Sequence, residues 1–536
     1  RRATWLKSVS QPEPIVCFRP AAPPHAAMTI SASFSSDLPR EPGAAGAGPP
    51  EPDGAAGRAT CFVCVMLVQV AQALMSFDGG ATQMSQVALL AAGWSQGWLG
   101  CLGAMDKFGQ TFTAPIWGRK LGKGGLKTLL TLGLFLKALS CLGFGLLTSK
   151  PLMLGAKFGM GAFEALVGIW AMAWINGNAP SDEARGQWQG FLNISAGLGS
   201  GVGSGVAGLF GRSMGYGFAF EVQAALIFVV AVLTLRTPGY LLRTSPEVPQ
   251  PVVEAAVRPT LGTAEPPQNP QFGRSASSAH SARLIWMNCL WRYVVLAMCV
   301  CTFIITGVGY MWQVTFEFVW GFTDAEATLS FLVLTGVGGL LGTQIGPMLI
   351  KKHLGGFGDP HGMKRCLHAF TRVTLAISIC GTCTSLLMLR KAWHVLDYNL
   401  PQQAWGFIMI SFLVGVFLLN FLINTMMGTI ISISINAVED HFKFVALGLT
   451  QSMQNVLGFA LGMLLPSLLG DLNVRCLDPN RPYLVVHGTS SAASMAMPLA
   501  CTWVLHLCMY LAAKEADARY QRTVQAAQPG DPRAAP

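Results

Sequence analysis

A few charged side chains lie within long apolar stretches of the sequence, where charge is unexpected. Asp106 and Lys107 lie midway along one stretch, and Lys157 and Glu164 lie on another. A charge near the centre of a bilayer costs about 2.5–3.5 kcal/mol or more, so such residues usually face a cavity or a partner. Lys157 and Glu164 are seven positions apart and therefore share one face of a helix, two turns apart.

These residues could bind and release a proton, or bind a charged solute. Glu164, held away from water and near a lysine, could change its protonation state as its surroundings change. The alternative is a permanent ion-pair network that locks two helices together. Asp78 lies near the end of its apolar stretch, and an exposed carboxylate in a loop explains it equally well. We predict a substrate or proton site formed by these charged residues: Asp78, Asp106, Lys107, Lys157 and Glu164.

The second half of the chain offers amides in place of charges. Gln313, Asn420 and Asn424 lie within apolar stretches there. Amides inside membrane helices often hold neighbouring helices together. We expect these three to complete the site from the second half, with helix-to-helix contacts as the alternative.

The elements that position these residues follow from the composition. Of 536 residues, 52% are hydrophobic and only 12% are charged, about half the charged fraction of a soluble domain. The apolar residues form runs long enough to cross a bilayer as helices. In lipid each backbone polar group must be satisfied within the chain, which favours helices. The sequence predicts an all-α membrane protein with twelve transmembrane helices in two six-helix bundles.

The predicted spans divide the chain into five parts. We expect a disordered tail over 1–58, rich in Pro, Ala and Gly, in which Met28 could be the translation start. A six-helix bundle is expected over 59–235, a Pro- and Ser-rich linker over 236–290, a second bundle over 291–512 and a disordered tail over 513–536. The spans are about 60–82, 92–117, 126–147, 152–176, 187–210, 216–235, 292–317, 325–350, 367–389, 405–430, 445–469 and 490–512.

Lys and Arg are concentrated in one alternate set of the connections between spans. The connections after the second and eighth spans and the linker are the richest in them. Basic loops remain on the cytoplasmic side of a membrane. We therefore expect both termini and the linker to be cytoplasmic.

A short polar phrase occurs once in each half. "NAPSDEAR" (178–185) follows the fourth span, and "NAVEDHFK" (436–443) follows the tenth. The basic connections after spans two and eight also correspond. A repeat of six helices in the same orientation is typical of two halves related by an axis along the membrane normal.

The connection 118–127, "GRKLGKGGLK", resembles the G-x-x-x-D-R-x-G-R-R signature of the major facilitator superfamily. Here Gly122 replaces the acidic residue that holds the family's inner gate, and Asp182 and Glu183 could supply the negative partner. The resemblance implies a cytoplasmic gate formed by Gly118, Lys123, Lys127, Asp182, Glu183, Arg185 and Lys443.

The first half also resembles the spinster-like lysolipid transporters within that superfamily. "KFGMGAFEAL" (157–166) is similar to their R-x-x-x-G-x-G-E-A pattern, with Lys157 in place of Arg. "SFDGGA" (76–81) is similar to their N-Y-x-D-R segment and keeps Asp78. This implies an amphiphilic substrate.

Small residues at four-residue intervals let helix backbones approach closely. Such series occur in the fifth span (Gly197, Gly201, Gly205) and in the eighth (Gly338, Gly342, Gly346). We expect these two series to lie where the two halves meet.

The expected function is secondary transport by alternating access, coupled to protons, of an amphiphilic or anionic organic solute such as a lysophospholipid or sphingoid lipid. A small sugar or carboxylate is an alternative substrate, and a non-transporting receptor is an alternative function. No P-loop, G-x-S-x-G or H-E-x-x-H motif is found, so we expect no enzyme activity, cofactor or metal. We expect a monomer in the lipid bilayer, in the plasma or an endolysosomal or vacuolar membrane, with no nucleic-acid partner.

Overall fold

The computed structural model describes residues 54–121, 125–179, 182–243, 278–354, 360–397, 403–439, 442–476 and 483–526. Within these ranges the regular structure is helical, with no strand. The first half contains α1 (Gly54–Met84), α2 (Gln86–Ala91), α3 (Gln96–Leu121), α4 (Leu126–Leu146), α5 (Lys150–Asn178), α6 (Asp182–Met214), α7 (Phe218–Arg236) and η1 (Gly239–Leu242).

The second half begins with a short helix and contains two π-helical segments. Its elements are α8 (Ser278–Met287), α9 (Cys289–Trp320), α10 (Asp324–Phe331), η2 (Leu332–Val337), α11 (Gly338–Leu354), α12 (Pro360–Asp397), α13 (Gln403–Asn436), α14 (Lys443–Met453), η4 (Gln454–Ala460), α15 (Leu461–Cys476), α16 (Tyr483–Ala500) and α17 (Thr502–Ala526).

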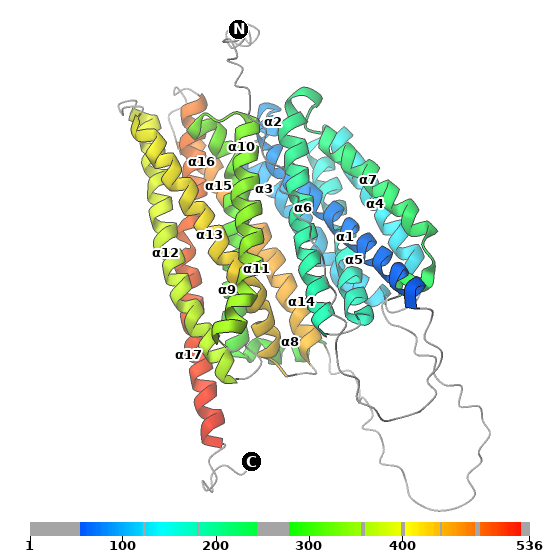
Figure 1. Cartoon of the computed structure of the whole chain (residues 1–536). Coiled ribbons are helices and arrows are strands. Elements are labelled where there is room, and N and C mark those ends of the chain that lie inside the picture. The colour runs from blue at the N-terminus through cyan, green and yellow to red at the C-terminus, as the bar shows by residue number, and fades with distance from the viewer. Residues whose placement is uncertain are drawn as a thin grey trace, which may run out of the picture. The chain divides into compact units, whose positions relative to one another are not determined.

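All twelve predicted spans lie largely in helical segments. Eleven segments of the described chain are long and apolar enough to cross a membrane. Helix α3 is the remaining one; it has 26 residues, but Asp106, Lys107 and the basic residues at its end make it more polar. In the first half α3 packs along α5 and α4 along α7, and in the second half α11 packs along α13 and α12 along α17. The prediction of an all-α protein with two six-helix bundles is confirmed (Figure 1).

The two halves are joined by hydrogen bonds near one end of the helices. We call this end, where α2 and α10 lie, the α2 face, and the opposite end the α8 face (Figure 1). The Ser95 hydroxyl donates to Asp471 Oδ2 at 2.7 Å, and Gln96 Nε2 donates to the Ser491 hydroxyl at 3.2 Å. The Tyr310 hydroxyl donates to the carbonyl of Leu99. These bonds hold the halves together at the α2 face.

Replacing Asp471 with Ala is expected to loosen the α2 face. A hydrogen bond to a charged group contributes about 1.5–3 kcal/mol. Its loss should therefore raise the population of molecules whose halves are separated at the α2 face by roughly tenfold or more. The buried Leu99, replaced with Cys as a reporter, should then react correspondingly faster with a membrane-impermeant maleimide. Ser213→Ala is the control, because the Ser213 hydroxyl donates to the Phe210 carbonyl within α6. Equal labelling in both backgrounds would contradict a tie through Asp471.

In each half, the polar phrase is hydrogen-bonded to the chain segment that follows the sixth span of the same half. In the first half, Asn178 Nδ2 donates to the carbonyls of Trp174 and Arg243, and Trp174 Nε1 donates to the Leu241 carbonyl at 2.8 Å. Leu241 lies in η1, directly after α7. The end of α5 is thereby attached to the segment that follows α7.

In the second half, Arg519 of α17 makes the corresponding attachment. Its guanidinium donates to the Ala437 carbonyl at 3.2 Å and to Asn288 Oδ1. Asn288 Nδ2 donates to the same Ala437 carbonyl at 2.7 Å. The start of α9, the end of α13 and the end of α17 therefore meet at one point.

The predicted disordered tail over 513–536 is wrong for residues 513–526, which continue α17. The helix is stabilised beyond the apolar span because Asp517 pairs with Lys364 Nζ at 3.0 Å and with His368 Nε2 at 2.9 Å, both on α12. Residues 278–287, at the end of the predicted linker, form α8, and α1 begins at Gly54, ahead of the predicted 59. Residues 1–53, 244–277 and 527–536 lie outside the described residues.

The prediction that the two glycine series meet between the halves is wrong for most of these residues. A Cβ at Gly342 or Gly346 would lie 2.5 or 2.1 Å from backbone oxygens of α13 in the same half. In α6 the close approaches to α1 are made by Gly199 and Gly203, against the Ala73 and Phe77 carbonyls. Of the predicted residues, Gly201 does face the second half, since its Cβ would lie 3.3 Å from Leu332 in η2.

Candidate functional site

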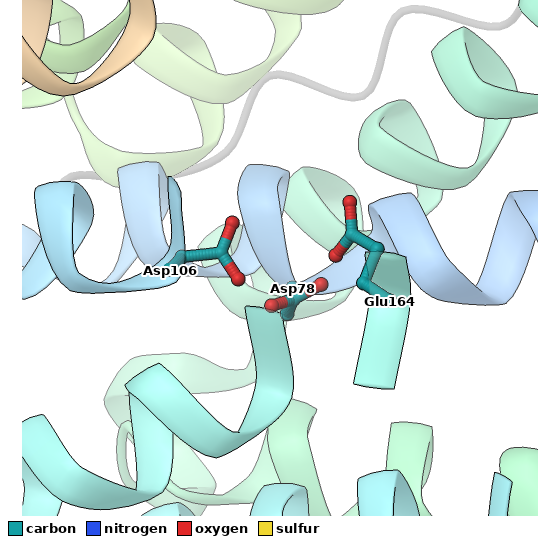
Figure 2. A group of neighbouring side chains, drawn as sticks. All are labelled: Asp78, Asp106 and Glu164. Carbon is teal, nitrogen blue, oxygen red and sulfur yellow. The ribbon is translucent and has the colours of Figure 1, made fainter. Parts of the chain in front are cut away.

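Six charged side chains from four helices of the first half meet in one cluster, which we call the charged cluster. It has three carboxylates, whose oxygens converge in Figure 2, and three lysines. The members are Asp78 of α1, Asp106 and Lys107 of α3, Lys137 of α4, and Lys157 and Glu164 of α5.

Asp78 occupies the most buried part of the cluster. Its Oδ2 lies 2.8 Å from Lys157 Nζ and its Oδ1 lies 3.4 Å from Lys137 Nζ, and all three side chains are at most 1% exposed. Gln223 Nε2 of α7 also lies 3.4 Å from Oδ1. The alternative that Asp78 is an exposed loop carboxylate is wrong, because α1 continues to Met84 and carries Asp78 inside the bundle.

Glu164 lies at the edge of the cluster, and its two oxygens have different partners. Oε2 accepts from Lys137 Nζ at 3.1 Å, whereas Oε1 accepts from Gln110 Nε2 at 2.8 Å and lies 3.7 Å from Lys107 Nζ. Lys107 in turn contacts Asp106 at 2.9 Å. The expected proximity of Glu164 to the Asp106–Lys107 pair is therefore observed.

This edge of the cluster faces the second half. The side chains of Lys107 and Glu164 are 16% and 15% exposed, in contrast to the enclosed Lys137. Lys107 Nζ lies 5.3 Å from the ring centre of Phe459 in η4, within the range of a cation–π contact. The cluster thus has an enclosed end at Asp78 and an accessible end at Lys107 and Glu164.

Lys137 was not among the predicted site residues, although it bridges Asp78 and Glu164. It satisfies the criterion that singled out the others, since it lies within the apolar run 126–147. The burial cost of a lone charge was the available signal. Gln110 and Gln223, which contact the same carboxylates, were also missed.

A pair of glycines brings α3 and α5 close enough for the cluster to form. A Cβ at Gly161 would lie 1.8 Å from the Asp106 carbonyl oxygen, and a Cβ at Gly109 would lie 2.2 Å from the Phe158 carbonyl oxygen. Both distances are shorter than real contacts allow, so these two positions require the absence of a side chain.

Gly161→Ala is expected to separate α3 from α5 and weaken the Gln110–Glu164 bond. Overpacking of this kind typically costs about 1–3 kcal/mol, and we expect a lower melting temperature and severalfold slower solute uptake. Gly168→Ala on the same helix is the matched control, because a Cβ there has nothing within 4 Å. The two variants would be compared by thermal unfolding in detergent, and equal stability would count against the close packing.

The three carboxylates do not fit a metal site, although they lie close together. Asp78, Asp106 and Glu164 each place an oxygen within 4.8 Å of the others. However, Lys137 Nζ already contacts two of them and Lys107 Nζ lies beside the third. A divalent cation there would meet three ammonium groups, so the donor set suits the lysines.

The predicted amides of the second half are used differently from one another. Asn420 donates to the carbonyl of Leu334 in η2 at 3.1 Å, and Asn424 donates to the Asn420 carbonyl and side chain at 2.8 and 2.9 Å. These two therefore support the alternative of contacts within the half. Gln313 on α9 is 3% exposed, and its side-chain oxygen has no hydrogen-bond partner among the described residues.

The predicted gate stays a prediction. Lys123 and the side chains of Asp182, Glu183 and Arg185 lie outside the described residues. Gly118 lies near the end of α3 in open space, Lys127 is the second residue of α4 and lies beside Gly239, and Lys443 begins α14.

Comparisons with known proteins identify the family. The model of the Major Facilitator Superfamily matches residues 62–463, and the chain belongs to this superfamily. It is therefore a multi-pass membrane transporter and not an enzyme. A comparison with curated protein sequences gave no match.

Three solved structures share the fold at low identity. A bacterial homologue of the human lysosomal transporter Spinster, in an inward-facing and unoccupied conformation, has 12% identity and a TM-score of 0.59, covering 85% of this chain and 97% of that one. The nucleoside transporter NupG has 12% identity and a TM-score of 0.55, covering 84% and 98%. A D-xylose–proton symporter has 15% identity and a TM-score of 0.55, covering 82% and 97%.

Proposed function

We propose that the protein moves an amphiphilic organic anion by alternating access and that Glu164 binds the coupled proton. The observation that carries this proposal is the position of Glu164 and Lys107. They are the most accessible members of a cluster that is otherwise enclosed, and Lys107 lies beside Phe459 of the second half. A carboxylate and an ammonium so placed can contact a proton and a solute that enter between the halves.

The contrast between the halves supports an amphiphile. The first half contributes charged side chains to the site, whereas the second half contributes the apolar ring of Phe459, which lies over Lys107. A solute with a charged head and an apolar tail matches both surfaces. We propose a lysophospholipid or sphingoid lipid as the solute, in keeping with the resemblance to spinster-like transporters. We also propose that the protein functions as a monomer in a plasma or endolysosomal membrane, with both termini in the cytoplasm.

A pH-jump uptake screen with the purified protein in proteoliposomes tests this function. Lysophospholipids, sphingoid phosphates, sugars and small carboxylates would be compared, and the expected result is accumulation of a single-chain anionic lipid driven by the proton gradient. Accumulation confined to a sugar or a small carboxylate would favour the alternative substrates. Binding without flux would identify a receptor that has kept the fold.

A further inference from the structure

The charged cluster is electrically balanced. With every member ionised, the carboxylates of Asp78, Asp106 and Glu164 match the three ammonium groups of Lys107, Lys137 and Lys157. An uncompensated charge in a low-dielectric interior is costly. Any change in the charge of one member therefore favours a second change that restores the balance.

Two lysines share the accessible carboxylate. Lys137 contacts one oxygen of Glu164 at 3.1 Å and Lys107 lies 3.7 Å from the other. Lys157 is committed to Asp78 at 2.8 Å in the enclosed part. A proton on Glu164 would thus leave the cluster with one net positive charge beside Lys107, which keeps Asp106 as its partner, and Lys137, which keeps its longer contact to Asp78.

Other groups near Glu164 do not remove this imbalance. Gln110 is neutral, and each remaining acid already has an ammonium partner, since Asp106 contacts Lys107 and Asp78 contacts Lys157. The titratable or charged groups that face Glu164 are, from each packed helix, Asp106 and Lys107 of α3, Lys137 and Cys141 of α4, Asp78 of α1 and Lys157 of α5.

Resting on the function proposed above, we propose that the solute's negative group pairs with Lys107 and replaces the charge of ionised Glu164, which balances Lys107 and Lys137. A proton from solution binds the Glu164 carboxylate, and one negative charge of the solute then restores neutrality. The proton and the anion bind cooperatively at a ratio of one to one. Lys137 is the positioning residue that transmits the protonation of Glu164 to the cluster, and Lys107 contacts the anion because it is the partly exposed lysine beside the second half.

Two lysolipids with matched acyl chains test the proposal. Oleoyl-lysophosphatidylglycerol has one negative charge throughout the range from about pH 5 to about pH 8, whereas oleoyl-lysophosphatidylcholine is zwitterionic. Binding to the purified full-length protein would be followed by tryptophan fluorescence across this range. Linkage of one proton to one anion predicts that the lysophosphatidylglycerol Kd rises by about tenfold per pH unit where free Glu164 is ionised. No such slope is expected for lysophosphatidylcholine.

Charge variants sharpen the test. Glu164→Gln fixes a net positive cluster, so lysophosphatidylglycerol should bind with a Kd that is low and independent of pH. Adding Lys137→Gln restores neutrality without a proton and should weaken binding at least tenfold relative to the single variant. Lys150→Gln, which removes a lysine far from the cluster at the α2 face, should behave as the wild type.

Several results would overturn the proposal. These are a pH slope that persists in Glu164→Gln, an equal slope for lysophosphatidylcholine, or no lysophosphatidylglycerol binding by the wild type. The wild-type comparison of the two lipids is decisive even where a variant fails to fold. Flux on the same preparation separates the two proposals: linked binding without flux refutes transport alone, and flux without linked binding refutes the one-to-one linkage alone.

Discussion

Asp78→Asn is expected to destabilise the protein by about 3–5 kcal/mol, the cost of removing one partner from a buried ion pair. The substitution leaves Lys137 and Lys157 without their shared carboxylate, and both lysines are at most 1% exposed. The amide has nearly the shape of the carboxylate, so that the change removes charge rather than volume. Thermal unfolding in detergent, followed by size-exclusion chromatography after heating, would measure the loss.

A second substitution distinguishes charge imbalance from other causes. Asp78→Asn combined with Lys157→Met removes the ammonium that lies 2.8 Å from Asp78, and it should recover a large part of the lost stability. Asp78→Asn melting at the wild-type temperature would show that the lysines do not depend on Asp78. Failure of the double variant to recover would indicate that the amide itself is the problem.

Glu164→Gln is expected to reduce proton-driven accumulation of lysophosphatidylglycerol in proteoliposomes by at least tenfold. Gln cannot take up the proton, yet it retains a side chain of the same length that can reach Gln110 and Lys137. Exchange between internal and external solute requires no net proton movement and should persist. Uptake after a pH step and exchange at equal pH would therefore be measured on the same vesicles.

Glu221→Gln is the matched control for this experiment. Glu221 lies in the first turn of α7, outside the charged cluster. The control should accumulate solute as the wild type does. Retention of pH-driven accumulation by Glu164→Gln would refute Glu164 as the proton site, and loss of exchange as well as accumulation would indicate a structural defect.

The helices could be predicted from the sequence because lipid imposes a simple rule on length and polarity. Every predicted span lies largely in helical segments, including α3, whose Asp106 and Lys107 lower its apolar character. The end of α17 could not be predicted in this way. Its polar residues resemble a tail, and the helix persists through contacts such as Asp517 with Lys364, which belong to the tertiary structure.

The sequence predicted most of the residues that belong to the candidate site, but it did not predict which lysine contacts which carboxylate. The rule that charge in an apolar run needs a partner found five of the six members, and it applied equally to Lys137. Which lysine meets which carboxylate depends on helix rotation, so Lys157 contacts Asp78 rather than Glu164 on its own helix. Glycine partners depend on the same packing, and Gly342 accordingly meets α13 instead of the other half.

The attachment of each polar phrase shows a correspondence between the two halves that their residues do not. In one half the amide of Asn178 donates to the Arg243 carbonyl, and in the other the guanidinium of Arg519 donates to the Ala437 carbonyl. The donor therefore lies on the phrase in the first half and on the segment after the sixth span in the second. A residue-by-residue alignment of the halves would overlook this correspondence, whereas a comparison of which chain segments touch would reveal it.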